Sequence, residues 1–322
     1  MSDHPPFIVL NPDGSCTRHI SFPCSLPTPD PDSKTLVLSK DLAINNVNKT
    51  GVRIHIPKET LSSSGTSIKK LPLIVYYHGG GFVLLSAATT LAHEFCNLLA
   101  AHLGAVVVNV DYRLAPEHRL PAAYDDGVEA LYWIKSTDDP WLTNYADYSN
   151  CYLMGTSAGA NLAYHAGLRV SQQVSDLKPL KIKGLILHCL FFGGVGRTES
   201  EIRLATVATN LTLSMCDTMW DLALPVGVSR DHEYCNPMMG WSLDGMGRFK
   251  DVGWRVMVTG RYGDLLIDRQ MGFAKALESK GVTCKCFYAD GDHGMEYFDE
   301  SKAKELFEEI SSFMSSVNLN KH

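Results

Sequence analysis

Short apolar runs recur along the chain and are separated by longer segments with helical periodicity. The runs cover residues 71–77, 106–111, 151–154, 182–188 and 255–259, and residues 52–57 and 283–289 predict further strands by alternation. Continuous apolar runs of this length are typical of strands buried on both faces of a parallel sheet. The pattern therefore predicts an α/β fold with a mostly parallel central sheet flanked by helices.

Two segments depart from this regular pattern. Residues 1–50 are rich in Pro, Ser and Asp, and the periodicity weakens again between Phe191 and Pro237, where residues 203–224 predict helices. With 322 residues and 45% hydrophobic residues, the chain can bury the core of one domain of this class. We therefore expect a single domain over residues 1–322, with residues 1–50 laid over the functional site.

One apolar run leads into a glycine-flanked serine. The run Cys151–Met154 continues as Gly155-Thr156-Ser157-Ala158-Gly159, the G-x-S-x-G pattern of a sharp turn from strand to helix. Glycines flank the serine because a Cβ at either position would collide with the adjoining strand or helix. Small residues also cluster in ordinary helix caps, so the pentapeptide alone is a weak signal. It predicts Ser157 as a nucleophile with an exposed hydroxyl.

A second glycine motif ends the strand at residues 71–77. His78 is followed by Gly79, Gly80 and Gly81, a glycine loop of the kind that forms oxyanion holes. Backbone N–H groups reach an oxyanion only where side chains do not intervene, so Gly80 and Gly81 are the expected donors, with Ala158 at the helix start as the third. A phosphate cradle is disfavoured because neither a Walker lysine nor a G-x-G-x-x-G spacing follows.

Polar residues follow two strands in the last third of the chain. Asp264 comes shortly after residues 255–259 and His293 shortly after residues 283–289, so both lie at carboxyl ends of strands, where α/β sheets gather their chemistry. This order, serine then acid then histidine, is that of the nucleophile-elbow hydrolases. Asp264 and His293 are the predicted acid and base, and Asp268 and Asp292 are competing carboxylates.

Other polar residues near these motifs have structural interpretations. We expect His78 to hydrogen-bond the loop backbone, His165 to be packed in a helix, and His188 to lie in a core strand. Arg113 and Glu117, in the loop after residues 106–111, are expected to brace the glycine loop through ion pairs.

Five stretches together resemble the plant carboxylesterases of the hormone-sensitive-lipase-like group. They are His78–Phe82, Asp111–Glu117, Gly155–Gly159, Asp231–Pro237 and Gly263–Gln270, and they span most of the chain. The resemblance implies an α/β-hydrolase fold with a cap built from the N-terminal segment, residues 1–50, and a helical insertion at about 195–237. It also implies Asp264, rather than Asp268, as the acid, and a serine esterase that needs no cofactor.

The sequence departs from this family at three positions. Leu265 stands where a proline commonly follows the acid, which removes a restriction on φ and leaves the acid less rigidly set. The separation of acid and base, 293 − 264 = 29 residues, is one shorter than usual, which raises the question of whether the imidazole still reaches the serine. Ala160 replaces a further glycine, a change that the helix should tolerate.

The same family contains proteins with other functions. Gibberellin receptors lack the histidine and isoflavanone dehydratases carry threonine at the nucleophile position, whereas this chain has His293 and Ser157. A carboxylesterase acting on small to medium hydrophobic esters is therefore favoured. The alternatives are a deacetylase, acyl transferase or cyclase/eliminase of plant specialised metabolism on the same site and, less favoured, a receptor-like binding protein.

Met and aromatic side chains in the helical insertion are candidates for the walls of an acyl pocket. Met215, Met219, Trp220 and Leu224 are adaptable side chains of this kind, with the core of the cap as the alternative location. Neither the identity of the ester nor the choice between monomer and dimer follows from these residues.

The composition of the chain limits the kinds of partner and the cellular compartment that we expect. The net charge of −6, without a basic cluster, disfavours nucleic-acid binding. No apolar window reaches about 18 residues and Met1–Pro6 does not resemble a signal peptide, so we expect neither membrane spanning nor secretion. Nine cysteines without C-x-x-C spacing indicate free thiols in the cytoplasm, with the nucleus also open, and Cys284-x-Cys286 alone does not predict a metal site.

Overall fold

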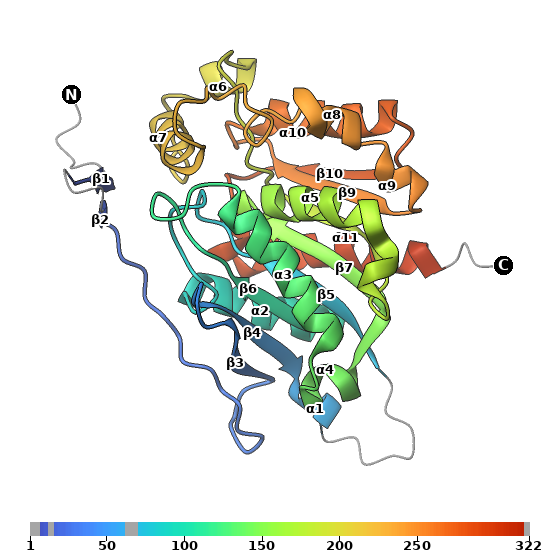
Figure 1. The fold of residues 1–322 in the computed structure, drawn as a ribbon. Coiled ribbons are helices and arrows are strands. Elements are labelled where there is room, and N and C mark those ends of the chain that lie inside the picture. Colours follow the sequence, from blue (N-terminus) through green and yellow to red (C-terminus); the bar gives the residue numbers. More distant parts are fainter. Residues whose placement is uncertain (1–6, 12–15, 62–69, 319–322) are drawn as a thin grey trace.

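The computed structural model describes residues 7–11, 16–61 and 70–318. Its centre is an eight-stranded sheet with the order β10-β9-β8-β7-β5-β6-β4-β3 (Figure 1). The strands are β3 Val37–Asn45, β4 Thr50–Pro57, β5 Leu71–Tyr77, β6 Val106–Asp111, β7 Ala146–Thr156, β8 Ile182–His188, β9 Arg255–Arg261 and β10 Cys284–Ala289. All pairings from β10 to β6 are parallel, and only the β6–β4 and β4–β3 pairings are antiparallel, which confirms the predicted α/β-hydrolase type of sheet.

The apolar runs form strands because both faces of the sheet are covered. Along β5, Leu73 and Val75 point into one hydrophobic core and Ile74 and Tyr76 into the other, as the period of two requires. The second core is closed by α2 Thr90–Leu103 and α11 Glu300–Asn318, and the first by α3 Ala122–Ser136, α5 Ala158–Val170 and α10 Ile267–Ser279 (Figure 1). Shorter helical segments are α1 Lys58–Leu61, α4 Pro140–Tyr145, η1 Ser171–Leu177, α6 Glu199–Arg203, α7 Leu213–Ala223, α8 Gly240–Gly245, α9 Arg248–Asp251 and η2 Met295–Tyr297.

The N-terminal segment divides into two parts. Ile8–Leu10 (β1) and Cys16–Arg18 (β2) form a small antiparallel pair, whereas β3 joins the central sheet beside β4. The expectation that all of residues 1–50 lie over the functional site was therefore wrong for Val37–Asn45. Polar residues interrupt the apolar pattern of β3, and one of them, Asp41, makes an ion pair with Arg53 of β4. Residues 1–6 and 12–15 of this segment lie outside the described ranges.

The helical insertion is interrupted. Helix α7 falls within the expected residues 203–224, but α6 ends at Arg203, residues 204–207 form a turn, and residues 208–212 have no regular secondary structure. Figure 1 shows α7 on the same side of the molecule as β1 and β2. In the described ranges, no helix combines the length and the apolar character needed to cross a membrane.

Candidate active site

Ser157 occupies a tight turn between β7 and α5. Its φ of +57° lies in the left-handed region, which is unfavourable for a residue with a side chain. A Cβ at Gly155 would lie 2.1 Å from the carbonyl carbon of Gly159, and a Cβ at Gly159 would lie 1.9 Å from the carbonyl oxygen of Tyr77. Positions 155 and 159 must therefore both be glycine. The predicted strand-turn-helix geometry of this motif is confirmed.

The structure brings Ser157, His293 and Asp264 into one hydrogen-bond chain. Nε2 of His293 lies 2.8 Å from Oγ of Ser157, and Nδ1 lies 2.7 Å from Oδ2 of Asp264. The three residues follow the carboxyl ends of β7, β10 and β9. The shorter separation of acid and base has not moved the imidazole out of reach of the serine.

Asp264 is held by hydrogen bonds rather than by a proline. It is 1% exposed, its Oδ1 accepts a hydrogen bond from the N–H of Leu266 at 2.9 Å, and its Oδ2 accepts one from Nε2 of Gln270 at 2.7 Å. Gln270 is itself fully buried. The expectation of a less rigid acid was therefore wrong, because these bonds fix the carboxylate directly.

The two competing carboxylates point elsewhere. Oδ2 of Asp268 accepts a hydrogen bond from the N–H of Ser200 at 2.7 Å, which ties α10 to α6. The side chain of Asp292 lies against Gly263, where an added Cβ would come within 2.6 Å of Oδ1. Within the described part of the chain, neither carboxylate hydrogen-bonds His293.

The glycine loop faces Ser157 across a small cavity. Gly80 and Gly81 have φ values of +105° and +62°, and an added Cβ would lie 2.1 Å from the carbonyl oxygen of Leu84 or from Sδ of Met219, respectively. Gly80 and Gly81 line the same cavity as Ser157. Over residues 7–11, 16–61 and 70–318, no acceptor is found for the N–H groups of Gly80, Gly81 or Ala158, which leaves all three groups able to donate to a ligand.

An aromatic side chain supports this loop. Nδ1 of His78 lies 2.8 Å from the carbonyl oxygen of Gly79, which confirms its expected structural role, and the ring stacks on Tyr112 at 4.3 Å between centroids. The hydroxyl of Tyr112 donates to the carbonyl oxygen of His78 at 2.7 Å. The role of Tyr112 in supporting the glycine loop could not be predicted from the sequence, because this contact forms only in the tertiary structure. His165 is packed as predicted, stacked on Tyr124 at 4.6 Å.

The expected ion-pair bracing of the loop was only partly correct. Arg113 pairs with Asp126 of α3 at 2.6 Å and was wrongly assigned to the glycine loop. Glu117 pairs with Arg18 at 2.7 Å, and Nε of Arg18 donates to the carbonyl oxygen of Val83 at 2.7 Å. Glu117 thus supports the glycine loop through Arg18, whose bonds hold the N-terminal segment beside that loop.

The cavity above Ser157 has a volume of about 170 Å³ and is mainly apolar. Met215 and Met219 line it as predicted, whereas Trp220 stacks on Phe191 in the core and Leu224 is buried away from the cavity. The apolar lining residues come from the N-terminal segment, the region of the glycine loop, the insertion and the turn after His293: Phe22, Leu84, Leu85, Leu91, Leu211, Met215, Met219 and Phe298. Such a cavity fits a small apolar group beside the serine.

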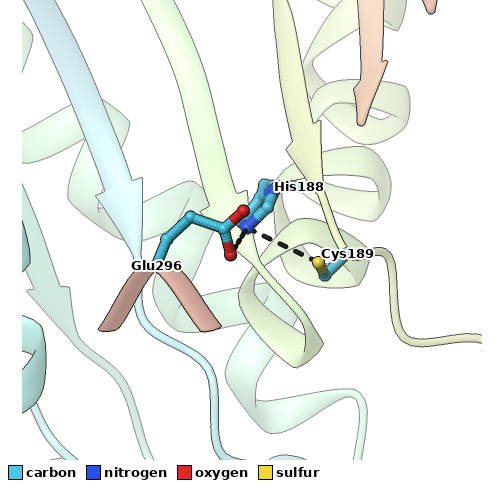
Figure 2. Close-up of side chains that lie close together, drawn as sticks. All are labelled: His188, Cys189 and Glu296. Carbon is cyan, nitrogen blue, oxygen red and sulfur yellow. Dashed lines mark hydrogen bonds and ion pairs between the residues drawn. The ribbon is translucent and has the colours of Figure 1, made fainter. Parts of the chain in front are cut away.

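A buried ion network lies behind the histidine turn. Glu296 pairs with Nε2 of His188 at 2.8 Å (Figure 2). It also pairs with Nε of Arg261 at 2.7 Å, and Nδ1 of His188 lies 2.8 Å from Oγ1 of Thr259. Burial alone would raise the pKa of Glu296, but the attraction of His188 and Arg261 outweighs it and lowers this pKa to about 2. His188 lies in a core strand as predicted, and Glu296 anchors the turn that carries His293.

Among residues 7–11, 16–61 and 70–318, two groups of side chains have metal-ligand chemistry, and both include Cys189. One consists of His188, Cys189 and Glu296, and the other of Cys189, Asp264 and His293. Arg261 already balances the charge of Glu296, and the second group is already joined by the hydrogen bond of its histidine and carboxylate. Burial raises the pKa of Cys189 well above its usual value, which disfavours the thiolate that a metal requires. These residues therefore fit their present pairing better than a metal ion.

Comparison with known proteins shows the family to which the chain belongs. A family model described as alpha/beta hydrolase fold matches residues 74–296. The chain belongs to this family. Among alpha/beta hydrolases, it is 52% identical to carboxylesterase 20 of Arabidopsis thaliana, over 96% of this chain and 95% of that protein. It is 46% identical to 3-O-acetylpapaveroxine carboxylesterase CXE1 of Papaver somniferum, over 86% and 88% of the two chains.

A solved esterase from Pyrobaculum calidifontis superposes on this alpha/beta hydrolase with a TM-score of 0.71 at 26% identity, covering 87% of this chain and 85% of that one. The chain is therefore an enzyme of the carboxylic ester hydrolase class. One more distant relative has another activity by name, the 2-hydroxyisoflavanone dehydratase of Glycine max, which is 31% identical over 96% of this chain and 97% of that protein.

Proposed function

We propose that this enzyme is a serine carboxylesterase that hydrolyses small to medium hydrophobic esters through an acyl-enzyme intermediate. The observation that carries the proposal is the hydrogen-bond chain from Ser157 through His293 to Asp264 beside an apolar cavity. The reaction needs no cofactor, because nucleophile, base and oxyanion donors are all groups of the chain.

In the first half-reaction, Oγ of Ser157 attacks the ester carbonyl and its proton moves to Nε2 of His293. Asp264 holds the imidazole in the tautomer that accepts this proton and stabilises the imidazolium. The N–H groups of Gly80, Gly81 and Ala158 donate to the oxyanion of the tetrahedral intermediate. When the intermediate collapses, the C–O bond to the alcohol breaks and His293 returns the proton to the alcohol.

In the second half-reaction, water takes the place of the alcohol. His293 accepts a proton from water as the water oxygen attacks the acyl-enzyme, and the new oxyanion forms at the same donors. The collapse of this intermediate releases the carboxylic acid and restores the hydroxyl of Ser157.

We infer that Phe22 in the N-terminal segment and Leu211, Met215 and Met219 in the insertion belong to a cap that shapes the acyl site. The support is that these residues line one cavity with Ser157. Among the described residues, the cavity lining contains no Asp, Glu, Lys or Arg side chain, which favours an uncharged acyl group.

A second candidate is the deacylation of a natural product at the same site. The specific observation in its favour is the 46% identity to the poppy enzyme, whose name gives 3-O-acetylpapaveroxine as its substrate. An elimination, as in the dehydratase, and receptor-like binding are less favoured, because Ser157 and His293 are both present and hydrogen-bonded.

For location and partners, we propose a cytoplasmic or nuclear enzyme whose partner is a small-molecule ester, without nucleic acid or membrane. All nine cysteines are unpaired, as expected in a reducing compartment.

The test is the hydrolysis of p-nitrophenyl acetate and butyrate by the wild type and by Ser157→Ala and His293→Ala, with intact mass measured after an organophosphate probe. We expect turnover and a single adduct in the wild type, no adduct in Ser157→Ala, and turnover reduced by about 10³-fold or more in both variants. A wild type with neither turnover nor adduct would contradict the proposal. Product analysis with acetylated natural products then separates simple hydrolysis from elimination.

A further inference from the structure

The turn after His293 is fixed to the rest of the molecule on two sides. Its short helix η2 carries Glu296, which is anchored by His188 and Arg261, and Tyr297, whose hydroxyl reaches the glycine loop. The position of the Tyr297 ring is therefore determined by the same anchored turn that holds His293.

A chain of hydrogen bonds runs through the Tyr297 hydroxyl. The N–H of Gly79 donates to the hydroxyl oxygen of Tyr297 at 3.3 Å, and that oxygen lies 2.7 Å from the hydroxyl of Tyr76. The hydroxyl of Tyr76 in turn donates to Oγ1 of Thr156 at 2.9 Å. Because Tyr76 uses its only proton on Thr156, Tyr297 is the donor in the bond between the two hydroxyls. Each bond in such a chain polarises the next.

This chain joins the predicted active-site loops. Gly79 directly precedes Gly80, and Thr156 directly precedes Ser157. The space is limited, since a Cβ at Gly79 would lie 3.2 Å from the carbonyl oxygen of Thr156 and 3.7 Å from the Tyr297 hydroxyl. A change at the hydroxyl therefore acts on the His78–Gly79 peptide, which directly precedes the peptide that presents the Gly80 N–H.

The surroundings keep the Tyr297 hydroxyl in the form that this chain requires. The ring packs edge-on against Phe95 at 5.2 Å between centroids. Burial raises the pKa of Tyr297 to about 12, so the hydroxyl keeps its proton at neutral pH and serves as donor and acceptor at once.

We propose that Tyr297 is a positioning residue, whose hydroxyl holds the glycine loop in register with the serine turn and the histidine turn. It acts through Gly79 on the oxyanion donor of Gly80, without itself touching the reacting atoms. The catalytic consequence rests on the proposed function, whereas the effect on the loop does not.

The main test is Tyr297→Phe, which keeps the ring beside the cavity and removes only the hydroxyl. We expect kcat to fall by roughly 3- to 10-fold, the scale of one lost hydrogen bond, while KM changes by less than about twofold. The affinity for a trifluoromethyl ketone, which forms a tetrahedral oxyanion on the serine, should fall by the same factor as kcat/KM.

The matched control is Tyr77→Phe. Tyr77 directly follows Tyr76 on β5 and is fully buried. Its substitution removes one hydrogen bond, to the carbonyl oxygen of Gly127 at 3.1 Å, on the other face of the sheet. Its kcat should stay within about twofold of the wild type although one buried hydrogen bond is lost. Tyr76→Phe, which breaks the link to Thr156 but leaves the Gly79 bond, should lie between the two variants.

Hydrogen exchange of residues 78–85 provides a readout that does not depend on activity. Without the acceptor of Tyr297, the Gly79 amide should exchange faster in Tyr297→Phe and remain unchanged in Tyr77→Phe. Unchanged exchange, or a kcat in Tyr297→Phe equal to that of the Tyr77→Phe control, would overturn the proposal. A wild type that hydrolyses no ester would instead refute the proposed function, and the exchange experiment would still decide the role of Tyr297.

Discussion

The histidine turn and helix α7 face each other across the cavity, but they are held in different ways. The turn is anchored by Glu296, whose side chain is 1% exposed in its ion pairs with His188 and Arg261. Helix α7 is held by Asp217, 27% exposed in its pairs with Arg197 and Arg230, and it presents Met side chains to the cavity. Buried directional bonds fix one wall, and adaptable apolar contacts form the other.

The two walls should therefore influence different properties of the enzyme, namely the rate of proton transfer and the range of acyl groups that it accepts. Proton transfer requires atoms placed within a few tenths of an ångström, which buried hydrogen bonds and ion pairs provide. The acceptance of different acyl groups requires side chains that can repack, which Met provides. Changes on the histidine side should therefore lower the rate, and changes in α7 should alter which ester is preferred.

The largest effect is expected for Asp264→Asn on the histidine side. The amide would hydrogen-bond the wrong tautomer of His293, so kcat should fall by about 10³- to 10⁴-fold with little change in folding. The measurement is the steady-state hydrolysis of p-nitrophenyl butyrate. Asp268→Asn is the matched control, because Asp268 bonds Ser200 rather than the histidine, and a loss of similar size there would contradict the assignment of the acid.

A large loss of stability is expected for Glu296→Gln. Removing one charge from this buried network should cost about 3 kcal/mol of unfolding free energy at pH 7, measured by urea denaturation. Glu305→Gln also removes a partner of Arg261, but Glu305 is 40% exposed, so its cost should stay below about 1 kcal/mol.

The pH dependence of this loss has a defined sign. The pKa of Glu296 is lowered in the folded protein from 4.5 to about 2, so its ionised form stabilises the fold fully above about pH 4.5 and loses this contribution as the pH falls towards 2. The difference between the wild type and Glu296→Gln should therefore shrink in acid. A difference that stays constant from pH 7 to pH 3 would contradict the ion-pair interpretation.

A smaller effect is expected at Gly81 of the glycine loop, which packs against Met219 of α7. In Gly81→Ala the new Cβ would lie 2.1 Å from Sδ of Met219, and alanine is strained at a φ of +62°. We expect kcat/KM to fall by roughly 10- to 100-fold, because the loop must shift away from the oxyanion position. The double variant Gly81→Ala/Met219→Ala should lose less kcat/KM relative to Met219→Ala than Gly81→Ala loses relative to the wild type, because the clash with Met219 is removed. An equal loss in the two comparisons would show that backbone strain in the loop, and not the clash, causes the effect.

The smallest effect is expected for Met215→Ala on α7. The larger cavity should raise KM for the acetate ester by a few-fold and shift the preference towards longer acyl chains, with kcat nearly unchanged. The measurement is kcat/KM across p-nitrophenyl esters of increasing chain length. Met239→Ala, at a site 47% exposed and outside the cavity lining, should leave the profile as it is.

The strands and the three residues of the candidate site could be predicted because their sequence patterns are local. Apolar runs mark buried strands wherever both faces of a sheet are covered, and the glycine pattern around Ser157 is contained in five residues, although Gly159 is required by the carbonyl oxygen of Tyr77 on β5. Asp264 follows such a run, and His293 follows the alternating strand at residues 283–289. Edge strand β3 was missed because its pattern is interrupted by polar residues, including Asp41 in the ion pair with Arg53.

The supporting residues could not be predicted, since their contacts form only when the helices and turns pack in the tertiary structure, at separations from six to more than 200 residues. Tyr297 contacts Gly79, more than 200 residues earlier in the sequence, and Gln270 bonds Asp264 only because α10 folds back over the turn. Arg113 was assigned to the wrong partner for the same reason, because nothing local distinguishes Asp126 from the glycine loop.

The position of β10 at the edge of the sheet has a consequence during synthesis. Strands β5 and β7 and the serine turn precede it in the chain, and β10, the last strand in the sequence, lies beside β9. A nascent chain that has emerged as far as β8 already contains Ser157 but neither Asp264 nor His293. The proposed triad can therefore assemble only after the chain beyond β10 has emerged, so ester cleavage by the proposed mechanism would report that this late segment is in place.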